Sequence, residues 1–247
     1  ARGDVYQVNL CRVLTAPVAA EISLVALHRR LNQVHPAPYA GFLSLPDVDL
    51  EVVCASPELF LRRDGTQLTT GPIKGTAATQ DQLQPKDQAE NIMIVDLMRN
   101  DLSRIAQTGS VQVLDLLRVE QHPGLVQLVS DITCHVESNL GWDQIMRSTF
   151  PPGSVTGAPK SSALAIIDEL EPASRDVYCG AFGWVDADTQ QAELAVAIRT
   201  FWRRDGLLRF GTGAGITWGS DPNLEWRETV LKADRLCRLA SGSEERL

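Results

Sequence analysis

Two pairs of carboxylates are the residues of this sequence whose spacing most directly suggests chemistry. Asp87 and Glu90 lie three residues apart in one predicted helix, and Glu225 and Glu228 have the same spacing in another. This spacing places both members of a pair on one helix face, where the like charges repel unless a cation lies between them. Carboxylate oxygens suit Mg²⁺, whose coordination is usually completed by water and substrate anions. The alternative, which the spacing alone favours, is two solvated acidic faces.

A lysine beside a glycine is the candidate nucleophile. Lys74 and Gly75 belong to the segment TGPIKGT at residues 70–76. Glycine lets the backbone approach a ligand closely, and free amides there can donate hydrogen bonds to an anion. A lysine that is desolvated or flanked by another cation has a lowered pKa and can attack an electrophile. An exposed loop lysine is the simpler alternative.

Two further glycine-rich segments could bind an anion. Residues 151–160 lead into the predicted N-terminus of a helix, where free amides and the helix dipole favour negative charge. The segment does not match the phosphate-binding pattern G-x-x-x-x-G-K-[ST], because Lys160 follows a proline. Residues 211–215 follow a strand but precede no helix, which disfavours a dinucleotide-binding fingerprint.

Three single residues are weaker candidates. Arg199 lies in an otherwise apolar predicted strand, where a charge needs a partner; the alternative is an edge strand or a structural ion pair. Lys232 follows Glu228 by four residues, a spacing that an ordinary pair on a helix surface explains equally well. Tyr178 is more often a core aromatic than a ligand contact. The four histidines show no metal-binding spacing.

The elements that must position these side chains alternate between strand and helix periodicity. Strands are predicted at residues 5–14, 41–45, 50–55, 59–63, 111–119, 125–136, 177–185, 194–202 and 207–211, with a hairpin turn at residues 64–65. Helices are predicted at residues 19–32, 86–105, 142–150 and 159–170, and a last helix begins with Asp221 as N-cap and Pro222 in its first position. Runs of strands punctuated by helices, without a regular βαβ order, favour an α+β fold with large antiparallel sheets.

Composition narrows the class of protein. The 247 residues carry 23 Lys and Arg against 31 Asp and Glu, a net charge of −8, which argues against a general nucleic-acid binder. No apolar run approaches the roughly 18 residues that a membrane span needs. The five cysteines, Cys11, Cys54, Cys134, Cys179 and Cys237, form no C-x-x-C pair, so we expect reduced thiols in a cytoplasmic protein. We expect one domain over residues 1–247, and because strand periodicity begins at residue 5, it is expected to be the C-terminal part of a longer chain.

Taken together, several motifs resemble the chorismate-utilising enzymes, a family that includes anthranilate synthase, aminodeoxychorismate synthase, isochorismate synthase and salicylate synthase. The motifs occur in the family's order and span nearly the whole chain: DVYQVNL (4–10), SPE (56–58), PIKGT (72–76), AENIMIVDLMRND (89–101), GAPK (157–160), AIRT (197–200), GAG (213–215) and Glu225-x-x-Glu228-x-x-x-Lys232. The resemblance implies an α+β fold like that of anthranilate synthase component I. In this fold two large antiparallel sheets pack face to face with helices outside.

Within the family, the motifs look most like the aminodeoxychorismate synthase branch. The lysine of PIKGT, Lys74, is typical of that branch, whereas anthranilate synthases usually carry alanine there. Gln7 stands where the isochorismate and salicylate enzymes have a lysine that activates water, which speaks against water as the nucleophile. The alternatives are an anthranilate synthase, which converts chorismate to anthranilate, or a non-catalytic chorismate-binding module.

The resemblance also implies a mechanism. Glu90 and Glu228 would bind Mg²⁺, with Asp87 and Glu225 in support. Lys74 would attack ring C2 of chorismate while Glu58 acts as general acid for the C4 hydroxyl. Ammonia would then add at C4 and displace the lysine, giving 4-amino-4-deoxychorismate for the synthesis of p-aminobenzoate and folate.

The resemblance further implies a set of substrate-binding residues and a partner. Arg199, Tyr178 and amides near Ala214 and Gly215 would hold the enolpyruvyl carboxylate, with Lys232 adding positive charge. Further residues expected at the substrate are Gly75, Thr76, Gly213, Ser154 and Gln127, the last in place of a histidine that usually faces the ring. No glutamine-hydrolysing motif is present in the sequence, so ammonia is expected from solution or from a separate glutamine amidotransferase subunit.

Overall fold

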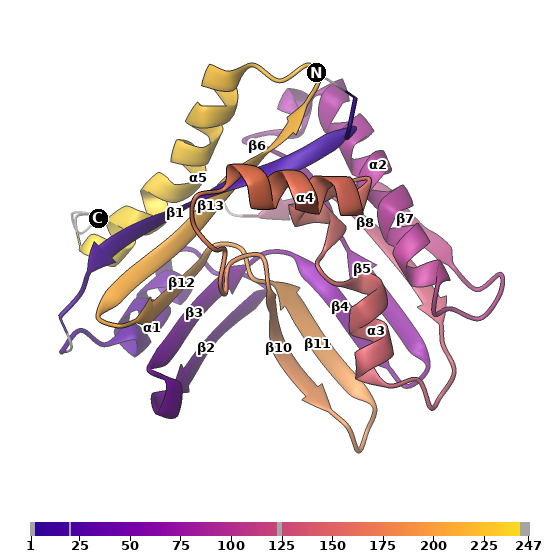
Figure 1. Cartoon of the computed structure of the whole chain (residues 1–247), viewed down its shortest axis with the longest axis horizontal. Coiled ribbons are helices and arrows are strands. Elements are labelled where there is room, and N and C mark those ends of the chain that lie inside the picture. Colours follow the sequence, from indigo (N-terminus) through magenta and orange to yellow (C-terminus); the bar gives the residue numbers. More distant parts are fainter. Residues whose placement is uncertain (1–2, 20, 123–124, 243–247) are drawn as a thin grey trace.

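The chain folds around two antiparallel β-sheets that carry helices on their outer faces (Figure 1). The computed structural model describes residues 3–19, 21–122 and 125–242. One sheet has six strands in the order β2-β3-β12-β13-β1-β9, and the other has seven in the order β10-β11-β4-β5-β8-β6, with β7 paired to β8. The predicted α+β fold with two large antiparallel sheets is confirmed.

Each sheet draws its strands from distant parts of the sequence. The six-stranded sheet consists of β1 (Gln7–Pro17), β2 (Tyr39–Leu45), β3 (Leu50–Ser56), β9 (Gly157–Ala158), β12 (Thr200–Arg204) and β13 (Leu207–Thr217). The seven-stranded sheet consists of β4 (Leu59–Asp64), β5 (Gln67–Gly71), β6 (Ile73–Ala77), β7 (Gln112–His122), β8 (Leu125–His135), β10 (Ala181–Asp186) and β11 (Gln191–Val196). The chain therefore passes between the sheets several times, and residues from both can meet.

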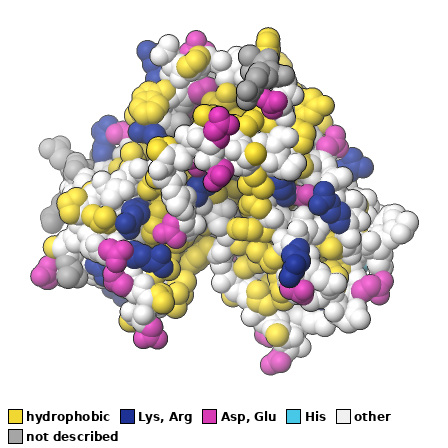
Figure 2. Space-filling view, in the orientation of Figure 1, with side chains coloured by type: hydrophobic (Ala, Val, Ile, Leu, Met, Phe, Trp, Pro, Cys, Tyr) yellow, Lys and Arg dark blue, Asp and Glu magenta, His cyan; other side chains and the backbone are white. Residues whose placement is uncertain are grey.

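Helices cover the outer face of each sheet (Figure 1). Helices α1 (Leu24–Val34) and α5 (Pro222–Ser241) pack on the six-stranded sheet, whereas α2 (Pro85–Ser103) packs on β6 and β8 of the other. Helix α3 (Trp142–Thr149) lies against α2, and α4 (Lys160–Leu170) lies against β1 and β9. In the space-filling view, hydrophobic side chains gather along the indentation between the two sheets, and charges of both signs are interspersed elsewhere (Figure 2).

Alternation along the strands explains the two main hydrophobic clusters. In β3 and β12, Val53 and Phe201 face outward to α1 and α5, whereas their neighbours Val52 and Trp202 belong to the larger cluster. Because successive strand residues point to opposite faces, one strand serves both clusters. The larger cluster also contains Leu68 of the seven-stranded sheet, so it joins the two sheets.

Two predicted strands are wrong in their extent, and both contain candidate functional residues. Residues 194–202 do not form one strand, because β11 ends at Val196 and the chain enters the other sheet as β12 at Thr200. Between them Arg199 has a φ of +49°, a left-handed conformation that interrupts a strand. Residues 177–180 are also not strand: Cys179 has a φ of +64°, and β10 begins only at Ala181.

Other differences are smaller. Residues 70–76, for which no strand was predicted, contribute to β5 and β6, and residues 211–215 lie inside the long strand β13 rather than after a strand. Helix α1 begins at Leu24 instead of residue 19, and residue 20 of that prediction lies outside the described residues. Pro159 is the N-cap of α4 and not its first residue. The predicted start of α5 is confirmed, since the Asp221 carboxylate accepts hydrogen bonds from two backbone amides of the first turn.

The cysteines and the helices bear on two expectations drawn from composition. All five cysteines are free thiols. Within the described ranges, none of the helices has the length and apolar character required to cross a bilayer.

Candidate active site

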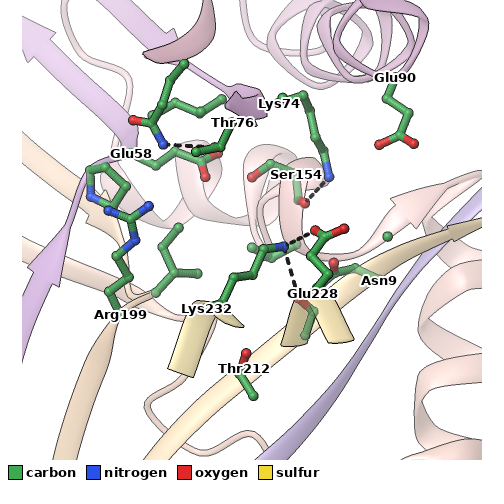
Figure 3. Close-up of a pocket in the computed structure, with 18 of the residues that line it drawn as sticks. Asn9, Glu58, Lys74, Thr76, Glu90, Ser154, Arg199, Thr212, Glu228 and Lys232 are labelled. Carbon is green, nitrogen blue, oxygen red and sulfur yellow. Dashed lines mark hydrogen bonds and ion pairs between the residues drawn. The ribbon is translucent and has the colours of Figure 1, made fainter. Parts of the chain in front are cut away.

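A cavity of about 440 Å³ is lined by residues of both sheets and of helices α2 and α5 (Figure 3). Fifteen of the predicted site residues line it: Glu58, Lys74, Gly75, Thr76, Asp87, Glu90, Gln127, Ser154, Tyr178, Arg199, Gly213, Gly215, Glu225, Glu228 and Lys232. Ala214 lies outside the cavity wall and is buried at 1% exposure, opposite Leu10 of β1. Strand alternation turns its side chain to the face opposite that of its neighbours.

The cavity also contains residues that were not predicted. Asn9 of β1 and Lys86 of α2 line it, as do Gln84, Ile198, Thr212 and Leu231. For two of them, the spacing to a candidate residue in the sequence could have indicated a place in the site. Lys86 lies four residues before Glu90, a spacing that places both on one helix face, and Asn9 shares a strand face with Gln7.

Lys74 extends from β6 into the cavity. Its Nζ donates a hydrogen bond to the backbone carbonyl of Ser154 at 3.1 Å (Figure 3). The next residue, Gly75, has a φ of +77°, and a Cβ there would lie 2.7 Å from Cβ of Asp87. Glycine is therefore what allows the strand carrying Lys74 to approach the first turn of α2.

The environment of Lys74 favours the neutral amine. Burial and, after it, the charge of Lys232 lower the pKa of the Lys74 ammonium. The carboxylates of Glu90, Glu58 and Glu228 act in the opposite direction. Because burial disfavours the charged form, the pKa lies below that of an ordinary lysine.

Glu58 is a nearly inaccessible carboxyl group in the turn between β3 and β4. Glu58 is only 4% exposed, and its backbone amide donates a hydrogen bond to the Ser56 hydroxyl at 3.1 Å. Burial raises the pKa of Glu58 to about 7, although the neighbouring Ser154 hydroxyl and the Lys74 ammonium lower it. A carboxyl group with this pKa can both donate and accept a proton near neutral pH.

The four predicted metal-binding carboxylates are not equivalent. The Asp87 carboxylate accepts a hydrogen bond from the backbone amide of Gln84 at 2.8 Å and completes the capping box of α2. Glu225 accepts a hydrogen bond from the Ser220 hydroxyl at 2.8 Å. These two carboxylates are thus already engaged in holding the N-terminal turns of their helices.

Glu90 and Glu228 remain as the oxygen donors with partners inside the cavity. Burial raises the pKa of Glu90; Lys74 and Lys86 lower it, and Asp87 and Glu225 raise it further. Glu228 forms an ion pair with Lys232 at 2.6 Å (Figure 3). Among the described residues no three His, Cys, Asp or Glu side chains converge as a ready metal site. A cation held here would take two protein carboxylates and complete its coordination from water or ligand oxygens, as Mg²⁺ commonly does.

Arg199 enters the cavity from the segment where the chain switches sheets. Its carbonyl accepts a hydrogen bond from the Ala55 amide of β3 at 3.2 Å, and its Nη1 lies 3.2 Å from Nε2 of His35. Burial lowers the pKa of the guanidinium, whereas the Glu58 carboxylate raises it. Arginine nevertheless stays charged, so it places a fixed cation in the cavity.

Gln127 and Tyr178 complete the wall. Gln127 of β8 donates from Nε2 to the Thr76 hydroxyl at 3.3 Å, while its Oε1 is buried without a hydrogen-bond partner among the described residues. The Tyr178 ring packs directly over Gly211, where a Cβ would come within 2.1 Å of it. Burial raises the pKa of the Tyr178 hydroxyl well above its usual value, and the neighbouring Cys179 and Cys11 thiols act in the same direction.

The arrangement brings the predicted nucleophile, the predicted proton donor and two cationic side chains into one enclosure. Lys74 can attack an electrophile when neutral, and Glu58 can protonate a leaving group. Arg199 and Lys232 supply positive charge for an anionic ligand inside a protein of net charge −8. The chemistry that fits is nucleophilic substitution on a small anionic molecule.

Comparisons with known proteins point to one family. The family model described as chorismate binding enzyme matches residues 1–238. Aminodeoxychorismate synthase component 1 of Klebsiella aerogenes is 39% identical over 246 residues, which cover 95% of this chain and 53% of the relative. An anthranilate synthase component 1 of Haloarcula marismortui is 38% identical over 246 residues, covering 95% and 49%.

A solved structure gives the same picture. Anthranilate synthase component I from Streptococcus pneumoniae TIGR4 superposes with a TM-score of 0.85 at 34% identity and covers 96% of this chain and 54% of that one. The chain therefore spans about half the length of the relatives that it matches.

Proposed function

The chain belongs to the family of chorismate binding enzymes, and from this premise we propose that it aminates chorismate with ammonia to give 4-amino-4-deoxychorismate. The observation that carries the proposal is the pairing of Lys74 and Glu58 in one cavity. Enclosure lowers the pKa of the lysine and raises that of the carboxyl group to about 7, so each favours the neutral form that the reaction needs.

Chorismate is a dianion, and the cavity offers a cationic group for each end. Arg199 would bind the enolpyruvyl carboxylate, since its guanidinium can donate two parallel hydrogen bonds to a carboxylate. The ring carboxylate would lie toward Glu90 and Glu228, where Lys232 contributes positive charge. The two ends of the substrate would thereby fix its ring between Lys74 and Glu58.

Mg²⁺ fits the donor set on the carboxylate side. Glu90 is a carboxylate whose pKa is raised by burial and by two acidic neighbours, and a divalent cation would relieve that repulsion. Glu90 and Glu228 would hold the metal, with Asp87 and Glu225 keeping the two helix ends in place. The bound metal would supply charge neutralisation for the ring carboxylate.

The chemical steps fall to Lys74 and Glu58. The neutral amine of Lys74 attacks ring C2, the ring double bond shifts, and the C4 hydroxyl leaves as water with the proton of Glu58. Ammonia then adds at C4, the double bond shifts back, and the bond between Lys74 and C2 breaks. Glu58 takes up the proton that the incoming ammonia releases, which restores both groups for the next cycle.

Identity alone does not choose between amination at C4 and anthranilate formation, because relatives of both kinds are 38–39% identical. Lys74 supports amination at C4, since the anthranilate branch usually carries alanine at this position. Gln7 supports ammonia over water. It is buried at 1% exposure, and both its Nε2 and the Lys74 Nζ lie beside Gly215. A neutral amide in that place cannot deprotonate water near neutral pH.

The relatives' name, component 1, supports a partner as the source of ammonia. We propose that a separate glutamine amidotransferase subunit supplies it. An ammonium salt at mildly alkaline pH should replace that subunit in a direct assay, because part of the salt is then free ammonia.

Product analysis tests the proposed function. The chain is mixed with chorismate, Mg²⁺ and an ammonium salt, and the products are separated and identified by mass. We expect 4-amino-4-deoxychorismate. Anthranilate would contradict the assignment to the C4-aminating branch. Binding of chorismate without any product, from protein shown to be folded, would instead support a non-catalytic binding module.

A further inference from the structure

We propose that His35 is a positioning residue that holds the Arg199 guanidinium in its orientation toward the substrate carboxylate. The inference rests on the proposed function, because it concerns the arginine expected to bind chorismate. Its basis is the contact between Nη1 of Arg199 and Nε2 of His35 at 3.2 Å. His35 does not line the cavity itself, so it would act through Arg199.

The direction of this hydrogen bond defines the state of His35. A guanidinium has five N–H donors and no acceptor, so Arg199 must donate and Nε2 of His35 must accept. The imidazole is consequently neutral and carries its proton on Nδ1. One donor of Arg199 is used in this bond, and the remaining donors stay available for a carboxylate.

Arg199 needs such an anchor because no regular strand directs its side chain. Arg199 lies between the end of β11 and the start of β12, and its backbone there has a φ of +49°. The backbone is held by the hydrogen bond from the Ala55 amide to the Arg199 carbonyl. The long side chain beyond it has several rotatable bonds, and ordering them without a partner costs conformational entropy.

His35 is itself in a fixed place. It caps the C-terminus of α1, where its backbone amide donates to the Leu31 carbonyl at 2.7 Å. Leu31 is 1% exposed and belongs to the hydrophobic cluster beneath α1. Pro36 follows and disfavours a helical conformation at His35, whose φ of −143° and ψ of 67° end the helix there. A rigid helix end therefore presents the imidazole to Arg199.

Chorismate binding to three variants of the same chain tests the proposal. His35→Leu removes the acceptor, and we expect chorismate binding to weaken about tenfold, since a hydrogen bond to a charged group is lost. His35→Gln restores an acceptor that reaches as far as Nε2, and we expect an affinity within about twofold of the wild type. His28→Leu, on the same helix, removes a histidine whose Nε2 contacts Asn32, and we expect no change. Titration calorimetry gives the dissociation constants.

Turnover separates positioning from a general loss of structure. If His35 positions Arg199, His35→Leu raises the KM for chorismate and leaves kcat within about twofold, and His35→Gln rescues it. A structural role would instead lower the fraction of active protein, so that kcat falls while KM stays constant in both variants. That pattern, or tight chorismate binding by His35→Leu, would overturn the proposal.

A spectroscopic measurement tests the contact independently of chorismate. In long-range ¹H–¹⁵N spectra of the labelled chain at neutral pH, His35 should show a protonated Nδ1 and an unprotonated Nε2. A proton on Nε2 would contradict the hydrogen bond from Arg199 and overturn the proposal. Failure of the wild-type chain to bind chorismate would overturn the proposed function, whereas the tautomer of His35 would still decide whether this contact exists.

Discussion

At the scale of single residues, the carboxyl group proposed as general acid, Glu58, also makes the stability of the fold depend on pH. In the folded protein its pKa is raised from an ordinary value of 4.5 to about 7, because burial disfavours the carboxylate. Below pH 4.5 the group is protonated in both states and has no effect. As the pH rises toward 7, the unfolded chain ionises freely and the folded chain does not, so the folded state loses stability. The loss is on the order of 3 kcal/mol above pH 7.

Glu58→Gln should remove this pH dependence together with the proton donor. We expect the free energy of unfolding of the variant, relative to the wild type, to be higher at pH 8 than at pH 5, because the variant has no buried carboxylate to ionise. The rate of chorismate amination should fall about 100-fold or more, as expected when a general acid is lost. Urea unfolding at both pH values and a rate assay measure the two effects.

Asp96→Asn, a change at a carboxylate on the exposed side of α2, serves as the control. A stability difference that does not vary with pH would refute the pKa argument.

Lys74→Ala should separate binding from chemistry. We expect formation of 4-amino-4-deoxychorismate to be lost, because the nucleophile is missing, while the chorismate dissociation constant stays within about threefold, since Arg199 and Lys232 remain. Product analysis and calorimetry give the two quantities. Lys86→Ala is the matched control, because it removes another cavity-lining lysine that has no part in the proposed chemical steps. Unchanged amination by Lys74→Ala would rule out the covalent step.

Glu228→Gln should remove both activity and Mg²⁺ dependence. The amide keeps the size of the side chain but loses the charge that would hold the cation, so we expect Mg²⁺ affinity to drop at least tenfold. A rate assay over a range of Mg²⁺ concentrations measures it. Asp234→Asn removes a carboxylate on the same helix that pairs only with Arg238 in the described contacts, and it should behave as the wild type. Full activity of Glu228→Gln would exclude this residue from the metal site.

At the scale of elements, local signals predicted what local chemistry determines. Asp221 and Pro222 marked the start of α5 correctly, because N-capping and the fixed φ of proline act within one turn. The prediction of one strand over residues 194–202 was wrong for the complementary reason. A continuous apolar run predicts one strand, but the change of sheet at Arg199 depends on which strands pair, and pairing is not a local property. Strand β6 was absent from the predicted strands, because Gly75 at its centre is a residue depleted in strands.

The same division applies to the site. Lys74, Glu90 and Glu228 were found from motifs whose order matches a known family, and the fold then placed them in one cavity. The role of His35 was not predicted. Its contact with Arg199 joins residues 164 positions apart, and neither residue carries a spacing signal toward the other. Long-range contacts of this kind become visible only when the two sheets are assembled.

The N-cap of α5 provides a prediction at this scale. Asp221→Ala removes hydrogen bonds to the Asn223 and Leu224 amides at 2.9 and 3.0 Å, and should lower the free energy of unfolding by about 1 kcal/mol. Ser23→Ala is the control, since Ser23 is the N-cap of α1 but forms no side-chain capping bond, and its effect should be below about 0.5 kcal/mol. Chemical denaturation measures both. Equal effects of the two changes would contradict the capping argument.

At the scale of the whole molecule, the cavity exists only where the two sheets are held together. Lys74 and Gln127 come from the seven-stranded sheet, whereas Gly213 and Gly215 come from the six-stranded one. The larger hydrophobic cluster spans both sheets, and Trp202 is its largest fully buried side chain. The packing of that cluster therefore determines the distance between the two halves of the site.

A tryptophan series tests this dependence on packing, because the same substitution can be made at three levels of burial. Trp202 has 0% exposure and donates a hydrogen bond to Asp176 at 3.2 Å, whereas Trp184 is 52% and Trp218 85% exposed. Trp202→Ala should lower the free energy of unfolding by about 3–5 kcal/mol, because the substitution leaves a large cavity in the core. Trp184→Ala and Trp218→Ala should each lower the free energy of unfolding by less than about 1 kcal/mol.

Because the core sets the spacing of the sheets, the Trp202 variant should also bind chorismate more weakly under conditions where it stays folded. A small effect at Trp202, or equal effects at all three positions, would show that the two sheets are held together by something other than this core.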